Sequence, residues 1–378
     1  MNKDSKIYIA GHRGLVGSAI LNNLKSKGYK NIVVKTHKEL ELTDQRLVAH
    51  FFQAEKPEYV FLAAAKVGGI AANNKYRADF IYENLMIQNN VIHQAYVHNV
   101  NKLMFLGSTC IYPKNSPQPL KEEYLLTDTL EYTNEPYAIA KIAGIKMCES
   151  YNLQYGTNFI SVQPTNLYGP NDNFDLEKSH VLPALIRKIH LGKALENDDW
   201  SAIRNDLDNL PIEGVTGANS NAEILTILDK YGLKIINDSV EIEIWGSGKP
   251  MREFLWSEDM ASACVYLMEN IDFKDIVKLN RHSERNIIVV KESVNLKQEM
   301  RNTHLNIGTG KDISIKDLSN TIKEIIQFNG SLYFNKSKPD GTLKKLTDIS
   351  KIKKLGWNYT INLEEGIKKV YQFYTNNN

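Results

Sequence analysis

The sequence has few cysteines, no long apolar run and no excess of either charge. Three cysteines in 378 residues are too few and too scattered for a disulfide framework or a zinc cluster. No apolar stretch approaches the roughly 20 residues that a bilayer-spanning helix needs. Lysine and arginine total 46 against 44 acidic residues, a balance that provides no electrostatic footprint for nucleic acid. We therefore expect a cytoplasmic protein with no membrane segment, no nucleic-acid partner and no metal site.

The order of the predicted elements indicates an α/β fold of the Rossmann type. Short strand-like segments occur at residues 6–10, 32–35, 58–63 and 102–107, and helical segments lie between them. Strands that alternate with helices in this way predict a doubly wound, mostly parallel sheet. Beyond residue 170 the alternation becomes irregular, which indicates a smaller mixed lobe at the C-terminal end.

These changes of pattern define the expected domains. We predict an NADP-binding Rossmann domain over residues 1–170, to which later segments such as 245–265 return. Residues 171–378 are expected to form mainly a substrate-binding lobe. Two charged stretches, at about 194–241 and 272–301, are predicted to be insertions in this lobe.

Three glycines follow the first predicted strand. Gly11, Gly14 and Gly17 have the spacing GxxGxxG, which is typical of short-chain dehydrogenases and reductases. Glycines at such a strand–helix junction permit a tight turn and a close approach of the backbone to a pyrophosphate. The N-terminus of the following helix adds hydrogen-bond donors and a partial positive charge. The loop therefore predicts a dinucleotide site rather than a purely structural turn.

The residues after the second predicted strand favour NADP(H) over NAD. NAD-preferring sites usually carry a carboxylate there for the ribose 2′-hydroxyl. Here the strand is followed by lysines and a histidine, and the first carboxylate is Glu39. Because Arg13 lies inside the glycine loop, a 2′-phosphate would meet cations. The competing interpretation is that these are ordinary surface lysines.

Tyr137 and Lys141 are the first catalytic candidates. Their spacing of four places both side chains on one face of a helix, where a phenol can act as general acid and an ammonium can lower its pKa. The same spacing often occurs in exposed helical pairs. Ser108 strengthens the assignment, because it follows the fourth predicted strand at the end where such sheets place catalytic groups.

Two further residues carry proton-transfer groups. Cys110 as a thiolate could remove a proton next to a ketone, and His180 could return one from the other face. Each also has a structural interpretation, since a lone cysteine is usually a small buried apolar residue and a lone histidine usually a packing residue.

Several long motifs resemble those of the GDP-L-fucose synthases, which are bifunctional epimerase-reductases that act on GDP-4-keto-6-deoxy-mannose. The resemblance covers nearly the whole chain outside the two predicted insertions. It rests on residues 11–18 (GHRGLVGS), 63–70 (AAAKVGGI), 107–113 (GSTCIYP), 134–144 (NEPYAIAKIAG), 164–170 (PTNLYGP), 245–254 (WGSGKPMREF) and 338–342 (KPDGT).

The resemblance implies a role for each candidate residue. Ser108, Tyr137 and Lys141 match the reductase triad, whereas Cys110 and His180 match the base and acid of the epimerisation. Besides Ser108, the implied contacts with the GDP-sugar are Lys188, Trp245, Arg252 and Asp340. The implied NADP(H) contacts are Gly11, Arg13, Gly14, Leu15, Val16, Gly17, His37, Ala64, Leu106, Lys141, Pro164, Asn166, Leu167 and His180.

The chain departs from the family at two places. The family has a second arginine for the 2′-phosphate where this chain has His37, and the segment between His180 and Trp245 is much longer than usual. Close relatives reduce GDP-4-keto-heptoses without epimerase chemistry, and this is the alternative substrate class. The family also implies a homodimer with a two-fold four-helix interface, formed by the long predicted helices at residues 79–98 and 137–155 of each chain.

Two other functions share some of these residues. A sugar-nucleotide 4,6-dehydratase typically carries an acidic pair where this chain has Thr109 and Cys110, so water elimination is disfavoured. A non-catalytic NADP-sensing protein is a possibility of a different class. The presence of Ser108, Tyr137 and Lys141 together argues against it.

Overall fold

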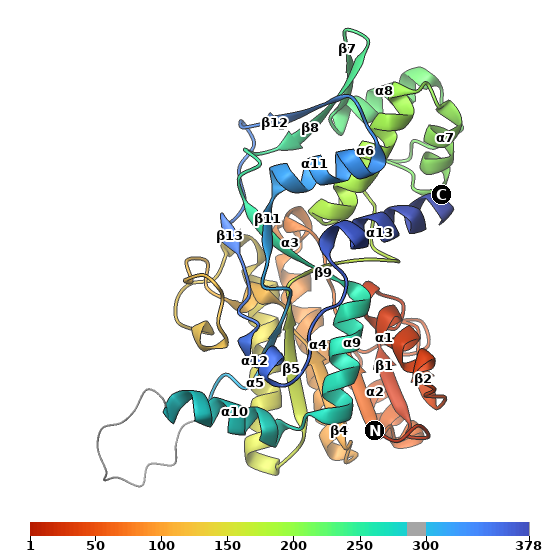
Figure 1. Cartoon of the computed structure of the whole chain (residues 1–378). Coiled ribbons are helices and arrows are strands. Elements are labelled where there is room, and N and C mark those ends of the chain that lie inside the picture. Colours follow the sequence, from red (N-terminus) through yellow and green to blue (C-terminus); the bar gives the residue numbers. More distant parts are fainter. Residues whose placement is uncertain (286–299, 378) are drawn as a thin grey trace. The chain divides into compact units, whose positions relative to one another are not determined.

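The computed structural model describes residues 1–285 and 300–377, which form two compact units (Figure 1). Unit 1 consists of Met1–Leu167, Ser257–Gly310 and Thr347–Thr360, and unit 2 of Tyr168–Trp256, Lys311–Leu346 and Ile361–Asn378. Three sequence-based boundaries differ from this division. Unit 2 begins at 168 instead of 171, and the segment 245–265 is divided after Trp256. The stretch 272–301 falls within unit 1, and its residues 286–299 lie outside the described residues.

Unit 1 contains a six-stranded sheet in which every neighbouring pair is parallel. The predicted Rossmann sheet is thereby confirmed. Parallel sheets are covered on both faces, which explains why these strands are continuous apolar runs in the sequence. In spatial order the strands are β10 (Leu305–Ile307), β5 (Phe159–Pro164), β4 (Lys102–Leu106), β3 (Tyr59–Leu62), β1 (Ile7–Ala10) and β2 (Ile32–Val34).

Helices of unit 1 pack in two groups. Helix α1 (Leu15–Ser26) packs against α9 (Ser257–Asn270), whereas α4 (Arg77–Val97) packs against both α2 (Gln45–Glu55) and α5 (Glu135–Tyr155) (Figure 1). The unit also contains α10 (Phe273–Arg285). Its shorter helical elements are α3 (Ile70–Lys75), α12 (Ser350–Lys354) and the 3₁₀ turns η1 (Thr109–Ile111), η2 (Glu122–Tyr124) and η3 (Tyr132–Asn134).

Helix α5 lies unusually close to strand β4 because of Gly144. A Cβ atom at this position would collide with the Phe105 ring of β4, and it would lie 2.9 Å from Oε1 of Gln88 on α4. The close contact places the first turns of α5 beside the carboxyl end of β4. This is the end of the sheet at which open α/β folds bind ligands.

Unit 2 is built around two small sheets. In the first, β8 (Ser239–Trp245) pairs in parallel with β12 (Ser331–Asn335) and antiparallel with β7 (Leu233–Ile236). In the second, β9 (Met251–Trp256) pairs with β11 (Asp312–Ser314) and β13 (Lys344–Lys345). The unit is completed by the helices α6 (Val181–Glu196), α7 (Trp200–Asn209), α8 (Asn221–Lys230), α11 (Ile315–Ile326) and α13 (Leu363–Asn377). The chain first passes from unit 1 to unit 2 within β6 (Asn166–Tyr168).

The stretch predicted as an insertion at 194–241 has its own small core. Apolar side chains of α7, α8 and β7 are buried together, among them Ile203, Leu207, Ile224 and Leu228. Arg187 of α6 donates to Oδ1 of Asp206 on α7 through Nε at 3.0 Å and Nη2 at 2.8 Å. Both charged side chains are 1% exposed, so the ion pair ties α7 to α6 inside the unit.

Candidate active site

The glycine loop adopts the compact turn that a dinucleotide phosphate requires. The N–H of Gly14 donates to the Gly11 carbonyl at 3.1 Å, and α1 begins immediately afterwards. A Cβ atom on Gly17 would collide with the Gly11 carbonyl, so α1 can pack against the loop only with glycine at this position. The loop therefore leaves a backbone cradle at a helix N-terminus, which fits a pyrophosphate.

The residues expected at the 2′-phosphate lie beside this loop. Arg13 is exposed, and its guanidinium interacts electrostatically with the Glu39 carboxylate, whose pKa is lowered mainly by hydrogen bonds from Thr36. His37 is also exposed, and its Nε2 lies 2.8 Å from a carboxylate oxygen of Glu41. Both cofactor roles stay predictions, but Arg13 has a freer approach to an anion than His37 has.

The catalytic candidates of unit 1 lie on two segments. The turn after β4 carries Ser108 and Cys110, and α5 carries Tyr137 and Lys141. A hydrogen bond of Lys141 joins α5 to the end of β4. Lys141 is buried, and its Nζ donates to the carbonyl of Leu106, the last residue of β4, at 2.7 Å. The same Nζ lies 5.7 Å from the centre of the Tyr137 ring. Cys110 interacts electrostatically with both Tyr137 and Lys141. The structure thus brings the turn after β4 together with the first turns of α5.

Burial changes the titration of this cluster. It lowers the pKa of Lys141 to about 8, because an ammonium is poorly solvated there. It raises the pKa of Tyr137 far above its ordinary value, and the nearby Cys110 adds to this. The expected lowering of the Tyr137 pKa by Lys141 is not found here, because burial and Cys110 both raise that pKa. A protonated phenol is still the form that a general acid requires.

Ser108 is oriented by two hydrogen bonds. Its N–H donates to Oε1 of Gln163 at 2.8 Å, and its Oγ accepts the N–H of Cys110 at 3.4 Å. Because Oγ acts as an acceptor toward Cys110, its proton is left for another acceptor, such as a ketone oxygen. Gln163 is fully buried at the end of β5 and was not expected from the sequence, although it directly precedes the 164–170 motif.

The remaining cofactor candidates lie in the same unit with one exception. Ala64 follows β3, Leu106 ends β4, and Pro164 ends β5. Asn166 and Leu167 begin β6, which is separated from β5 by Thr165 alone. The exception is His180, which precedes α6 in unit 2. It keeps an exposed surface, yet the surrounding protein lowers its pKa.

The four substrate candidates of unit 2 gather around the end of β8. Lys188 donates to the carbonyl of Glu243, two residues before Trp245, at 3.0 Å. Arg252 donates to the carbonyl of Thr342 at 2.6 Å. Asp340 accepts hydrogen bonds from the N–H and hydroxyl of Ser247 at 2.8 and 2.7 Å. The structure therefore joins residues that are widely separated in the sequence.

This cluster has the chemistry of a nucleotide-binding surface. The Trp245 side chain is 68% exposed, so one aromatic face is available for stacking. Burial lowers the pKa of Lys188 to about 8, so its ammonium would be favoured by a nearby anion. Arg252 supplies a planar guanidinium that suits phosphate oxygens.

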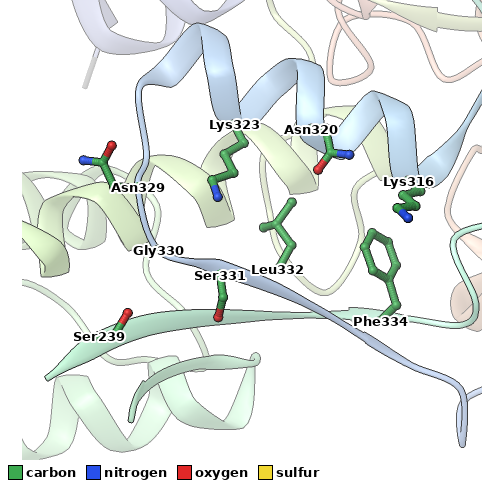
Figure 2. Close-up of a pocket in the computed structure, with 9 residues that line it drawn as sticks. All are labelled: Ser239, Lys316, Asn320, Lys323, Asn329, Gly330, Ser331, Leu332 and Phe334. Atoms are coloured by element: carbon green, nitrogen blue, oxygen red, sulfur yellow. The ribbon is translucent and has the colours of Figure 1, made fainter. Parts of the chain in front are cut away.

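A separate pocket of unit 2 lies between α11 and β12 and contains none of the expected site residues (Figure 2). Lysine and asparagine side chains approach it from α11, and two apolar side chains come from β12 (Figure 2). Its lining consists of Ser239, Lys316, Asn320, Lys323, Asn329, Gly330, Ser331, Leu332 and Phe334.

Two searches of the described residues bear on other site classes. Within residues 1–285 and 300–377, no group of three or more His, Cys, Asp or Glu side chains is arranged to hold a metal ion. No helix in these ranges has the length and apolar character to cross a membrane.

The part of the chain that carries the glycine loop and the Ser108, Tyr137 and Lys141 cluster matches a known family model. Residues 7–206 and 214–280 match the model described as the NAD dependent epimerase/dehydratase family. The chain belongs to this family. Within it, the predicted resemblance to GDP-L-fucose synthases is confirmed. The chain is 44% identical to the GDP-L-fucose synthase of Escherichia coli K12, covering 98% of this chain and 97% of that protein.

Two solved structures from the family cover nearly the whole chain. One is a GDP-6-OMe-4-keto-L-xylo-heptose reductase from C. jejuni, with 48% identity, a TM-score of 0.88 and coverage of 100% of this chain and 99% of that chain. The other is a GDP-mannoheptose C4 reductase from Campylobacter jejuni with NADP bound. It has 47% identity and a TM-score of 0.83, and 99% of each chain is covered.

Proposed function

We propose that the protein is an NADPH-dependent reductase of a GDP-linked 4-keto sugar, of the GDP-L-fucose synthase type. The observation that carries this proposal is the cluster of buried Lys141 and Cys110 with half-buried Tyr137, beside Ser108 at the end of β4. The fucose synthase of E. coli and the C. jejuni heptose reductases, all similar along nearly their whole length, support the same reaction class.

The backbone cradle of the glycine loop and Arg13 would hold the cofactor, and its nicotinamide supplies a hydride when bound. Tyr137 donates its phenolic proton to the ketone oxygen, which becomes the new hydroxyl. Ser108 donates a hydrogen bond to the same oxygen and stabilises the negative charge that develops there. Lys141, held by the Leu106 carbonyl, keeps its charge near the Tyr137 oxygen as the proton leaves.

Unit 2 supplies the expected binding surface for the GDP moiety. Lys188 and Arg252 offer positive charge to the diphosphate, and Trp245 offers an exposed aromatic face. Asp340 acts through Ser247, because its carboxylate holds the turn that follows Trp245. In this assignment unit 1 binds NADP(H) and unit 2 binds the sugar nucleotide.

Epimerisation at C3 and C5 is the finer part of the proposal. Cys110 would remove a proton next to the ketone, and His180 would return one. The alternative is a GDP-4-keto-heptose C4-reductase without epimerase activity. Two observations favour this alternative. Both solved structures described above are named heptose reductases, and the 194–241 stretch adds α7, α8 and β7 directly after the helix that carries Lys188.

A substrate panel tests the function directly. The purified protein is mixed with NADPH and either GDP-4-keto-6-deoxy-mannose or a GDP-4-keto-heptose, and NADPH oxidation is followed. Each reaction is repeated in deuterated water, and the product is analysed by mass spectrometry. Deuterium at C3 or C5 supports the epimerase-reductase, and reduction without deuterium supports the heptose-type reductase. NADPH binding without oxidation of any 4-keto GDP-sugar would leave the non-catalytic NADP-sensing function.

We further propose a cytoplasmic homodimer that forms through α4 and α5. These helices pack against each other and carry several exposed apolar side chains, including Tyr82, Val97, Leu153 and Tyr155. Exposed apolar residues gathered on one pair of helices suit a two-fold four-helix contact. Light scattering at micromolar concentration should give the mass of two chains, and a monomeric mass would count against this interface.

A further inference from the structure

The turn that carries Ser108 and Cys110 is held only loosely by its own hydrogen bonds. The N–H of Cys110 lies 3.4 Å from Oγ of Ser108, and the N–H of Tyr112 lies 3.4 Å from the Thr109 carbonyl. A third bond, from Ile111 to the Ser108 carbonyl, is 3.3 Å long. Hydrogen bonds of this length are weak. The groups that hold the two ends of η1 therefore contribute to the position of the Cys110 sulfur.

The beginning of the turn is held by Gln163, as described above, and the end is held by Tyr112. The Tyr112 hydroxyl donates to Oδ1 of Asn306 at 2.5 Å and lies 3.1 Å from Nε2 of His304. Tyr112 is 4% exposed, and the two partners are fully buried. Both partners belong to or adjoin β10, the edge strand of the sheet, so the hydroxyl ties η1 to an element distant in sequence.

The donors in this network have one consistent arrangement. The Nδ2 of Asn306 donates to the Leu120 carbonyl at 2.9 Å, which turns its Oδ1 toward Tyr112. Because the single phenolic proton goes to Oδ1, Nε2 of His304 must donate to the phenol oxygen. Burial keeps the pKa of His304 well below its ordinary value, which agrees with a neutral ring.

The network continues to a buried carboxylate. The N–H of Asn306 donates to Oε1 of Glu122 at 3.0 Å, and the other Glu122 oxygen lies 3.7 Å from Nζ of Lys351. Asn306 is thus held through its backbone and its side chain at once. Tyr112 therefore binds to partners that have little freedom to move.

We propose that Tyr112 is a positioning residue that sets the place of the Cys110 sulfur relative to Tyr137 and Lys141. This inference rests on the proposed function insofar as Cys110 is the base of an epimerisation. Phenylalanine at position 112 would keep the apolar contacts of the ring but would leave His304 and Asn306 with unpaired buried polar atoms. The turn would then lose the bond of the Tyr112 hydroxyl to Asn306 of β10.

The test compares Tyr112→Phe with Tyr29→Phe. The control removes a hydroxyl from a tyrosine that is 2% exposed and donates to Glu269 at 2.7 Å, away from η1. Alkylation of Cys110 by iodoacetamide is measured by peptide mass spectrometry across a pH series. Cys148 and Cys264 serve as internal references, because both are buried and burial raises the pKa of each thiol, that of Cys148 to about 12.

In Tyr112→Phe we expect the high-pH alkylation rate of Cys110 to rise about fivefold or more, because the turn opens, and the rate in Tyr29→Phe to stay unchanged. Deuterium exchange into the substrate should fall at least about tenfold, as expected when a base is misplaced by about 1 Å. Reduction of a substrate that needs no epimerisation should fall much less, since Gln163 still holds Ser108. A general loss of structure would instead lower both activities and NADPH binding together.

The proposal would be overturned if Cys110 in Tyr112→Phe were alkylated at the same rate as in the wild type. The alkylation readout requires no substrate, so it tests the positioning role even if the wild type proves to lack exchange activity. In that case the epimerase function fails while the positioning role of Tyr112 stands. If Tyr112→Phe does not fold, His304→Leu removes one partner of the hydroxyl and substitutes no residue of the turn. Because the bond to Asn306 stays, Cys110 alkylation should rise by less than about fivefold, and an unchanged rate would again overturn the proposal.

Discussion

Replacement of Tyr137 by phenylalanine removes one oxygen atom and almost no packing. The Tyr137 ring meets the Phe80 ring edge to face, with 6.4 Å between centroids and an angle of 82°, and phenylalanine preserves this contact. The hydrogen bond from Lys141 to the Leu106 carbonyl does not involve the phenol. The variant should therefore fold and bind NADPH normally while it lacks the proton donor for the ketone oxygen.

The expected loss of activity follows from the missing proton transfer. General acid catalysis contributes about 10²- to 10⁴-fold, which corresponds to about 2.7–5.4 kcal/mol in the activation barrier. Single-turnover NADPH oxidation should slow by this factor, while the Kd for NADPH from fluorescence titration stays within about twofold. Tyr151→Phe is the matched control, because it removes a hydroxyl on the same helix that lies 2.8 Å from Nδ1 of His93. A Tyr137→Phe enzyme that kept more than about half of the wild-type single-turnover rate would refute the assignment.

Three further predictions concern charged groups. Arg13→Ala should narrow the preference for NADPH over NADH, because Arg13 is the best-placed cation for the 2′-phosphate, and equal wild-type kcat/KM values for the two cofactors would contradict this idea. Because burial lowers the pKa of Lys141 to about 8, its ammonium is present below that pH and lost above it. The kcat/KM for reduction should therefore fall as the pH rises through about 8. A flat pH profile in this range would exclude a catalytic role for the Lys141 ammonium. Asp206→Asn should lower the free energy of unfolding by about 3–5 kcal/mol in a urea titration, because it leaves the buried Arg187 guanidinium without its counter-ion. A loss below about 1 kcal/mol would show that the backbone carbonyls around Arg187 are sufficient.

The Rossmann sheet could be predicted because the pattern that marks each strand lies within a few consecutive residues. The strands that end at Ala10, Leu62 and Leu106 are short apolar runs between helical segments. The capping box at Ser220 and Glu223 likewise marks the start of α8. Strand β10 could not be found in this way. It has three residues, and what places it beside β5 is a register between residues far apart in the chain.

The sequence predicts which residues form the catalytic cluster, but it does not predict their pKa values. Spacing and order identify Ser108, Tyr137 and Lys141, since one helix face and one strand end determine where they lie. The raised pKa of Tyr137 depends on how deeply the folded chain buries the phenol, which spacing does not reveal. The same is true of the roles of Gln163 and Tyr112, because their hydrogen-bond partners lie 55 and 194 residues away in the sequence.

The contact of α5 with β4 through Gly144 has a consequence for how this sequence can change over time. Gly144 has no chemistry of its own, yet any side chain there would push α5 away from Phe105, and Lys141 lies one turn earlier on the same helix. Drift at position 144 would thus be selected against through the reaction rate rather than through stability alone. Descendants of this chain should retain glycine there for as long as they retain the lysine, and lineages that lose catalysis should be free to replace both.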